Sequence, residues 1–345
     1  MPTISFAGAA DLMIDETDPD FMLEHVAGEM RAADITYVNL EGPMCDPGEK
    51  NPALLGIASA IRSAPRVAAA LKRAGVDVVS LANNHTMDYG VPGLEQTLDL
   101  LREHGIPQCG AGRNLHEARQ PVFIESRGVR VALLSYTTVC PPSYAATAER
   151  HGAAYLRAST AYEANLRLFL QPGSPMAIRT TANAEDVKAM KEDVAAARAQ
   201  ADAVLVSWHW GVSERWGKIS EYMREMGRAA IDAGAAAVLG HHAHMLLGIE
   251  HYKGCPIFYS LGNFAFDKSH PFFLPETALV KCDIGSDGRL SKLRLLPLRI
   301  NAERQPAPAT GMAAHRIAWL LDEQSHGMGT RFACDGGEIA LAPIN

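Results

Sequence analysis

The sequence has few cysteines, and their spacing predicts neither a zinc site nor a disulfide framework. Six cysteines are scattered among 345 residues, with no pair at Cys-x-x-Cys spacing. Isolated thiols of this kind are typical of proteins that remain reduced. We therefore expect free thiols, and any metal ligands should be residues of other types.

Long apolar runs and blocks of basic residues are also missing. No apolar stretch approaches the roughly 18 residues that cross a bilayer, and residues 1–6 lack the basic start and apolar core of a signal peptide. The net charge is −7, without a stripe of lysine or arginine. This composition argues against nucleic acid or a membrane as the partner. We expect a cytoplasmic protein that acts on a small-molecule or peptide-like substrate.

The remaining composition is that of an ordinary globular protein. Hydrophobic residues make up 48% of the chain and charged residues 21%. The sequence contains no internal repeat, low-complexity tract or clear linker. We therefore predict a single domain over residues 1–345, built from two mixed sheets covered by helices.

The most informative stretch is residues 236–245, where three histidines follow a short apolar run. The apolar residues before Gly240 are typical of a buried strand that ends at a glycine. A neutral imidazole offers a nitrogen lone pair to a divalent metal. On a loop after a strand, His242 and His244 can point to one position, while His241 faces away or binds a second metal. We interpret the run as metal-binding rather than as a hydrogen-bonded polar loop.

Polar residues also follow four other predicted strands. Asp11 follows a strand over residues 3–8, and Glu41 follows one over 34–39. The pair Asn84 and His85 follows a strand over 76–81, and His209 follows one over 203–208. Alone, Asp11 would be interpreted as a turn or helix cap. Because open α/β sheets bind ligands at the carboxyl ends of their strands, these positions together predict a site.

The candidate ligands are Asp11, Glu41, Asn84, His209, His242 and His244. Six ligands exceed the needs of one tetrahedral zinc and suit two ions about 3.5–4 Å apart. The mixed nitrogen and oxygen donors favour one or two divalent ions of Mn, Zn, Fe or Co over Ca. His85 is the candidate group to protonate a leaving group, and Glu214, on the loop after His209, is a second candidate for proton transfer.

Residues 138–182 have a poor secondary-structure pattern and are too long for an ordinary loop. We interpret them as an insertion or a lid over the site, with a surface excursion as the alternative. Hairpins are predicted over 121–136, 249–260 and 279–299, and helices over 20–33, 64–74, 91–104, 183–201 and 220–234. The region 279–345 should add strands and a terminal helix over 311–324.

The motifs at the strand ends resemble those of the CapA capsule-synthesis proteins (the poly-γ-glutamate synthesis group), a branch of the calcineurin-like metallophosphatase superfamily. The resemblance covers about residues 3–267 and keeps the family's motif order. It rests on Ala-Asp-Leu-Met at 10–13, Asn-Leu-Glu at 39–41, Asn-Asn-His-Thr-Met-Asp-Tyr-Gly at 83–90, His-Trp-Gly at 209–211, Gly-His-His-Ala-His at 240–244 and Ser-Leu-Gly-Asn-Phe at 260–264.

This resemblance implies an α/β fold, a four-layer α/β/β/α sandwich of the metallophosphatase type, with a metal centre at the strand ends. It implies carboxylate ligands at Asp11 and at Glu41, which stands where the superfamily has a bridging aspartate. Asn84 matches a ligand position and His85 that of the general acid. His209, His242 and His244 match the superfamily's later histidines.

The sequence departs from the superfamily pattern at Met13, where an Asp-x-His motif would have a histidine. One of the two metal positions should therefore lack an imidazole. Alanine replaces a common glycine at position 9 or 10, which is a minor change. Capsule-synthesis proteins are usually exported or held at the membrane, whereas the sequence shows neither signal-peptide features at residues 1–6 nor a membrane-spanning apolar run. We therefore expect a catabolic or tailoring enzyme in place of a role in a secreted polymer.

Three functions fit these residues. The first is a metal-dependent hydrolase of a phosphoester or an amide, with a γ-glutamyl-like amide among the candidates. The second is a non-hydrolytic enzyme such as an epimerase, in which the metal would acidify a Cα–H beside a carbonyl. The third is a capsule or poly-γ-glutamate polymer-handling protein without catalysis.

Overall fold

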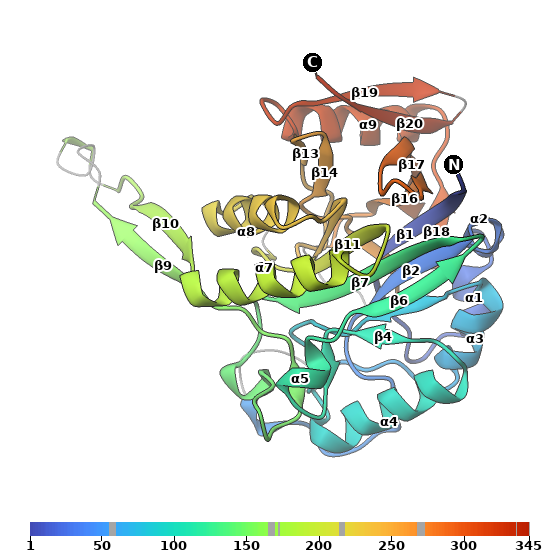
Figure 1. Cartoon of the computed structure of the whole chain (residues 1–345), viewed down its shortest axis with the longest axis vertical. Coiled ribbons are helices and arrows are strands. Elements are labelled where there is room, and N and C mark those ends of the chain that lie inside the picture. The colour runs from blue at the N-terminus through green and yellow to red at the C-terminus, as the bar shows by residue number, and fades with distance from the viewer. Residues whose placement is uncertain are drawn as a thin grey trace.

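The computed structural model describes residues 1–54, 60–164, 170–171, 173–213, 218–267, 273–335 and 337–344. Two β-sheets lie face to face, and helices cover their outer faces (Figure 1). The layers follow the order helices, sheet, sheet, helices. The α/β sandwich predicted from the sequence is therefore confirmed.

The larger sheet has ten strands. Its path is β19-β20-β17-β16-β1-β2-β3-β4, with β15 paired to β1 and β18 paired to β17. Strands β1, β2 and β3 run parallel, whereas β16 runs antiparallel to β1. The strands are β1 (Thr3–Met13), β2 (Ile35–Leu40), β3 (Val78–Ser80), β4 (Gln108–Cys109), β15 (Asn263–Phe266), β16 (Glu276–Gly285), β17 (Leu290–Ile300), β18 (Pro306–Pro308), β19 (Thr330–Asp335) and β20 (Glu338–Pro343).

The second sheet has six strands in the order β13-β14-β12-β11-β7-β6. Its central strands β7, β11, β12 and β14 run parallel. Because side chains alternate along a strand, Leu205 packs in the core shared with the larger sheet while Val206 packs under the outer helices. The strands are β6 (Val122–Ser126), β7 (Val129–Thr137), β11 (Ala203–His209), β12 (Ala237–His241), β13 (Ile249–Tyr252) and β14 (Cys255–Phe258).

The outer helices divide between the two sheets. Residues of α1, α2, α3 and α4 share the core cluster of the larger sheet, and residues of α7 and α8 share that of the smaller one. The helices are α1 (Pro19–Leu23), α2 (Ala27–Ala32), α3 (Val67–Ala74), α4 (Gly90–Glu103), α5 (Leu115–Ala118), α7 (Ala184–Arg198), α8 (Glu221–Asp232) and α9 (Met312–Gln324), with short 3-10 turns η1 (Pro52–Leu54) and η2 (Pro142–Tyr144). None of the described helices is long and apolar enough to cross a membrane.

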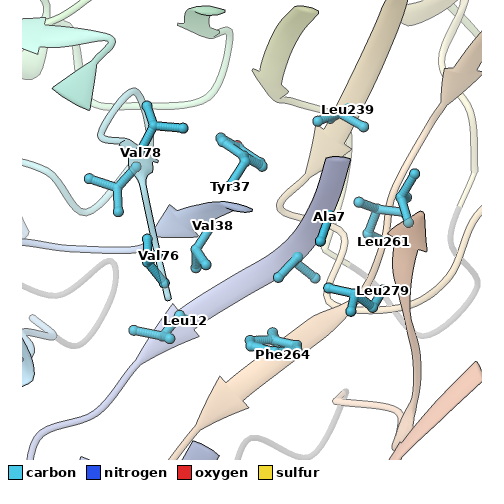
Figure 2. Close-up of a cluster of buried hydrophobic side chains, with 14 of the residues drawn as sticks. Ala7, Leu12, Tyr37, Val38, Val76, Val78, Leu239, Leu261, Phe264 and Leu279 are labelled. Carbon is cyan, nitrogen blue, oxygen red and sulfur yellow. The ribbon is translucent and has the colours of Figure 1, made fainter. Parts of the chain in front are cut away.

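Apolar side chains pack on both faces of the larger sheet. Figure 2 shows part of this buried cluster, with Ala7 and Leu12 of β1, Tyr37 and Val38 of β2 and Leu239 of β12. All five are buried. Burying one large aliphatic or aromatic side chain stabilises a fold by about 1.5–3 kcal/mol. This packing holds the carboxyl ends of the two parallel strand sets at a fixed separation.

Most predicted elements are present, with two corrections. The hairpins predicted over 121–136, 249–260 and 279–299 form as β6–β7, β13–β14 and β16–β17. The helix predicted over 20–33 is instead two helices, α1 and α2. Between them the N–H groups of Glu24 and Val26 donate to carbonyl groups three residues before, at 3.3 and 3.1 Å, so a tight turn interrupts the regular helix. The helix predicted over 311–324 is not terminal, since β19 and β20 follow it as a hairpin that adds two strands to the larger sheet.

Residues 138–182 contain more regular structure than the sequence indicates. Strand β8 (Gly152–Ala153) pairs with β5 (Ala111–Gly112), and β9 (Ala158–Glu163) pairs antiparallel with β10 (Ala177–Ala182). Strands β9 and β10 form a hairpin, here called the arm, that projects from the sandwich (Figure 1). Helix α8 holds its base, where the Tyr222 N–H donates to Thr180 Oγ1 at 3.2 Å. A lid role for this region stays a prediction.

Candidate metal centre

Polar side chains from both sheets meet at one edge of the sandwich. Asp11 lies near the end of β1, where the strand register shifts against both β2 and β15. Such irregularities often redirect a side chain beside a functional site. The Asp11 carboxylate is fully buried. It accepts a hydrogen bond from Asn39 Nδ2 at 2.7 Å and another from the His242 backbone N–H at 3.2 Å.

Glu41 follows the last residue of β2 and lies at the centre of the cluster. Its Oε1 atom is 3.7 Å from His244 Nε2, 3.8 Å from His209 Nε2 and 3.9 Å from His85 Nε2. Both carboxylate oxygens are buried, and neither has a hydrogen-bond partner among the described residues. Three imidazoles therefore surround an unpaired carboxylate at distances too long for direct hydrogen bonds.

The loop after β12 carries His242 and His244 on strained backbone. Their φ angles are +87° and +54°, in the left-handed region that few residues other than glycine adopt. Strain of this kind clusters at functional sites. Gly240, just before the loop, allows β12 to approach the neighbouring chain closely, because a Cβ there would lie 2.3 Å from the Tyr259 carbonyl oxygen. The close packing and the strained loop fix where the two rings point.

His209 links the smaller sheet to the loop after β3. Its Nε2 atom lies 2.7 Å from Asn84 Oδ1 and 3.2 Å from His242 Nδ1. His244 is oriented by Asn263, whose Oδ1 lies 2.9 Å from His244 Nδ1. If Nδ1 of His244 carries the proton, Nε2 is left with a lone pair on the side of Glu41.

Burial and mutual repulsion set the charges of these groups. Burial, and then the charges of Asp11 and Asp88, raises the pKa of Glu41 well above its ordinary value. Burial would raise the pKa of Asp11 too, but its contacts with His241 outweigh burial and lower it. Burial and the neighbouring histidines lower the pKa of His209 well below the usual range and that of His242 to about 3. The imidazoles of His209 and His242 are therefore neutral near pH 7, the form that binds metal.

His85 belongs to a second chain of contacts at the edge of the cluster. Its Nδ1 atom lies 2.7 Å from Asp88 Oδ2, and the Tyr144 hydroxyl donates to Asp88 Oδ1 at 3.1 Å. Burial, with the charge of Asp88, raises the pKa of Tyr144, so its phenol remains a donor. The chain Tyr144–Asp88–His85 fixes the ring of His85 with Nε2 facing Glu41.

The structure thus brings together all six candidate ligands, namely Asp11, Glu41, Asn84, His209, His242 and His244, with His85 beside them. These six residues are called the metal centre below. Ligand atoms of Glu41, His242 and His244 all lie within 4.8 Å of one another. Glu214, the second candidate for proton transfer, lies outside the described residues.

Several neighbours of the centre carry no role in the sequence-based prediction. Asn39 and Tyr37 point into the space between the sheets: Asn39 donates to Asp11, and the Tyr37 hydroxyl lies 2.9 Å from His241 Nε2. His241 differs from these two, because the sequence left it either facing away or binding a second metal. It is fully buried and turns toward Asp11, with Nδ1 3.1 Å from Asp11 Oδ1, and its binding of a metal stays a prediction. The sequence did contain an indication of Asn39 and Tyr37. Residues 37, 39 and 41 are spaced two apart, and this spacing places side chains on the same face of a strand.

Met13, the departure from the superfamily pattern, does not join the cluster. It is fully buried and packs with Ile61 and Phe266. This small apolar cluster borders the centre, because the Phe266 ring packs edge-on against the His244 ring with 5.8 Å between the ring centroids. An apolar cluster thus surrounds Met13, the residue that stands where the superfamily pattern described above would have a histidine.

The donor set fits a divalent metal. Two buried carboxylate oxygens without hydrogen bonds are costly unless another group neutralises them. Glu41 offers this pair beside the imidazoles of His209 and His244. Donors held about 2.1 Å from one ion lie roughly 3–4 Å apart, in the range of the Glu41–histidine distances. An amide oxygen of Asn84 and a second carboxylate at Asp11 complete a mixed nitrogen and oxygen set.

The fold is a two-sheet α/β sandwich with histidines, carboxylates and an asparagine gathered at its strand ends. The sequence profile of the family "Bacterial capsule synthesis protein PGA_cap" matches residues 4–268. The chain belongs to this family, and the matched range contains every residue of the metal centre.

Curated relatives agree with this assignment. The chain is 30% identical over 298 residues to "Capsule biosynthesis protein CapA" of Bacillus anthracis, covering 86% of this chain and 66% of the relative. It is 30% identical to "PGA biosynthesis protein CapA" of Bacillus subtilis (strain 168), covering 85% and 68%. A third relative, 30% identical over 80% of this chain and 68% of the other, is a "Probable polyglutamine synthesis accessory protein" of Mycobacterium tuberculosis (strain CDC 1551 / Oshkosh). The chain spans about two thirds of the length of these relatives.

Proposed function

We propose that this protein is a metal-dependent hydrolase that cleaves an amide or a phosphoester with metal-activated water. The observation that carries the proposal is Glu41, whose two buried carboxylate oxygens lack hydrogen bonds and face three imidazoles. One or two divalent ions of Mn, Zn or Fe would be held by Glu41, His242 and His244, with Asp11, Asn84 and His209 as further ligands.

A bound divalent ion in such a site makes hydroxide from water near neutral pH and neutralises charge on the reacting oxygen. The protein contributes the remaining parts. The Asp88 carboxylate holds a proton on His85 Nδ1, so Nε2 is the atom that exchanges a proton with the substrate. Tyr144 fixes the Asp88 carboxylate in turn. His85 is thus placed to give a proton to the leaving group, a role usually worth about 10²–10⁴ in rate.

The relatives favour an amide substrate over a phosphoester. Their names refer to capsule and PGA biosynthesis and to a polyglutamine synthesis accessory role. The family resemblance is to proteins of poly-γ-glutamate synthesis, a polymer joined by amide bonds. We therefore place a peptide-like, γ-glutamyl-type amide first among the substrates.

The word "accessory" in the name of the mycobacterial relative supports a second candidate, a polymer-handling protein without catalysis. The two candidates differ in one simple experiment. Purified protein is analysed for metal and screened against phosphoesters, γ-glutamyl amides and small cyclic amides. For a hydrolase, activity disappears with a chelator and returns with Mn or Zn. Polymer binding without turnover, in protein that contains metal, would favour the second candidate.

A further inference from the structure

A closed path of polar side chains crosses the core behind Asp11. It takes two residues from β2 and one each from β1, β3 and β12, so it connects the larger sheet to the smaller one. All of these side chains are fully buried. The group is called the polar bridge below, and its members are Asp11, Tyr37, Asn39, Ser80 and His241.

Short contacts run around the polar bridge in both directions from Tyr37. On one side, the Tyr37 hydroxyl lies 2.9 Å from His241 Nε2, and His241 Nδ1 lies 3.1 Å from Asp11 Oδ1. On the other side, the hydroxyl lies 2.7 Å from Ser80 Oγ. Ser80 donates to Asn39 Oδ1 at 2.6 Å, and Asn39 Nδ2 donates to Asp11 Oδ1 at 2.7 Å. Both sides therefore end on the same carboxylate oxygen.

The two oxygens of Asp11 thus have different surroundings. Oδ1 is held within the polar bridge. Oδ2 accepts the backbone N–H of His242 at 3.2 Å and lies 3.7 Å from His244 Nδ1. One oxygen is therefore engaged by the core, and the other lies beside the loop that carries two candidate ligands.

Tyr37 is the residue at which the two sides of the bridge meet. It belongs to the same buried apolar cluster as Leu239 (Figure 2). Burial raises the pKa of Tyr37, so its phenol stays protonated. A polar group in such surroundings is costly unless its hydrogen bonds are made, whereas an apolar side chain has no such requirement. Packing alone therefore does not account for a tyrosine at this position.

We propose that Tyr37 is a positioning residue for Asp11. It acts through His241 on one side and through Ser80 and Asn39 on the other. It holds Oδ1 of Asp11 in the bridge, so that Oδ2 is the oxygen offered to an ion. This inference rests on the metal binding in the proposed function and adds a residue that contacts none of the ligands directly. Replacing a partner that orients a metal ligand typically lowers metal affinity by about 10–100-fold.

The test measures the affinity of metal-free protein for Mn²⁺ by isothermal titration calorimetry. Tyr37→Phe keeps the aromatic ring and removes the hydroxyl, so affinity should fall about tenfold or more although every ligand remains. Ser80→Ala opens the other side of the bridge and should also lower the affinity. With saturating Co²⁺, Tyr37→Phe should change the visible absorption spectrum, because Asp11 is then free to offer both oxygens.

The matched control is Ser207→Ala. Ser207 Oγ lies 2.6 Å from the Tyr37 hydroxyl and is buried, as Ser80 is, but it does not belong to the closed path. A second control, Tyr136→Phe, removes a buried phenol that donates to Asp193 at 2.9 Å. Both controls should bind Mn²⁺ with native affinity and give the native Co²⁺ spectrum.

Three results would overturn the role of Tyr37. They are native Mn²⁺ affinity in Tyr37→Phe, an unchanged Co²⁺ spectrum in that variant, and equal losses of affinity in Ser80→Ala and Ser207→Ala. If Tyr37→Phe does not fold, the comparison of Ser80→Ala with Ser207→Ala decides the question.

These measurements need no turnover, so they separate the inference from the proposed function. If metal affinity depends on the bridge but native protein hydrolyses none of the substrates, the hydrolase is wrong and the role of Tyr37 stands. If native protein is a metal-dependent hydrolase but Tyr37→Phe and Ser80→Ala bind Mn²⁺ as it does, the role of Tyr37 is wrong and the hydrolase stands.

Discussion

The metal centre and the arm differ in how their side chains are held. At the centre, Asp11 and His209 are fully buried, and each is fixed by contacts from both sheets. On the arm, Tyr162 and Ile178 are mostly exposed and belong to an isolated two-stranded sheet. The same chain thus contains a buried polar cluster and an exposed two-stranded hairpin.

The difference predicts how substitutions act in the two regions. Chemistry requires groups fixed to within a fraction of an ångström, in surroundings of low dielectric where charges act strongly. A side chain on an exposed hairpin loses little packing when it is shortened. Substitutions at the centre should therefore have large effects on metal content and turnover, while substitutions on the arm should have small effects on stability.

The largest effect is expected at the histidine loop. His242→Ala or His244→Ala removes an imidazole beside Glu41, so at least one metal should be lost and turnover should fall to background. Metal content by mass spectrometry and activity with added Mn check this. Unchanged metal content in both variants would mean that the cluster is only a hydrogen-bonded polar loop.

The centre was largely predictable from the sequence because its residues follow strands that a period of two and flanking glycines reveal. Parallel strands bring their carboxyl ends to one edge, so Asp11, Glu41 and His209 could be grouped without a structure. The partners that orient them were less visible. Asn263 and Tyr144 come from distant segments, and only the fold places them beside His244 and Asp88.

The next effect is expected at His85, which tests whether the centre separates metal binding from proton transfer. His85→Asn should keep the fold and the metal while reducing turnover about 10²–10⁴-fold, because Asn84 lies at the same strand end and contacts His209 independently. The loss should be smaller for substrates whose leaving group needs no proton. Metal loss, or native activity on a poor leaving group, would contradict the role.

A matched pair of substitutions compares the packed body with the arm in stability. Met226→Ala, at a fully buried position of α8, should lower the free energy of unfolding by about 3 kcal/mol, since it leaves a cavity. Ile178→Ala on the arm should change it by no more than about 0.5 kcal/mol. Denaturant titration measures both. A large loss at Ile178 would show that the arm is part of the folded core.

The arm itself was poorly predicted, for a physical reason. Strands β9 and β10 are rich in alanine, serine and threonine, and neither face is buried, so alternation of apolar and polar residues is weak. Hairpin β19–β20 was also missed, although its pairing extends the larger sheet beyond β17. Buried elements have a clear apolar pattern in the sequence. Elements at the edge of a sheet have a weak pattern, because their formation depends on pairing partners that the local sequence does not identify.

The smallest effect concerns the two metal positions within the centre. Met13 packs in an apolar cluster with Ile61 and Phe266, at a position where the resemblance described above implies a histidine. One of the two proposed metal positions should therefore have one imidazole fewer. We expect its affinity for the ion to be lower by about tenfold or more, which corresponds to a loss of about 1.4 kcal/mol in binding free energy. Titration of metal-free protein with Mn, followed by calorimetry, should show two unequal steps or a single step. In a Met13→Ala control, which adds no ligand, the difference between the steps should remain. Two equal, tight sites in native protein would show that another residue replaces the missing histidine, and the centre would then be more symmetric than its buried contacts indicate.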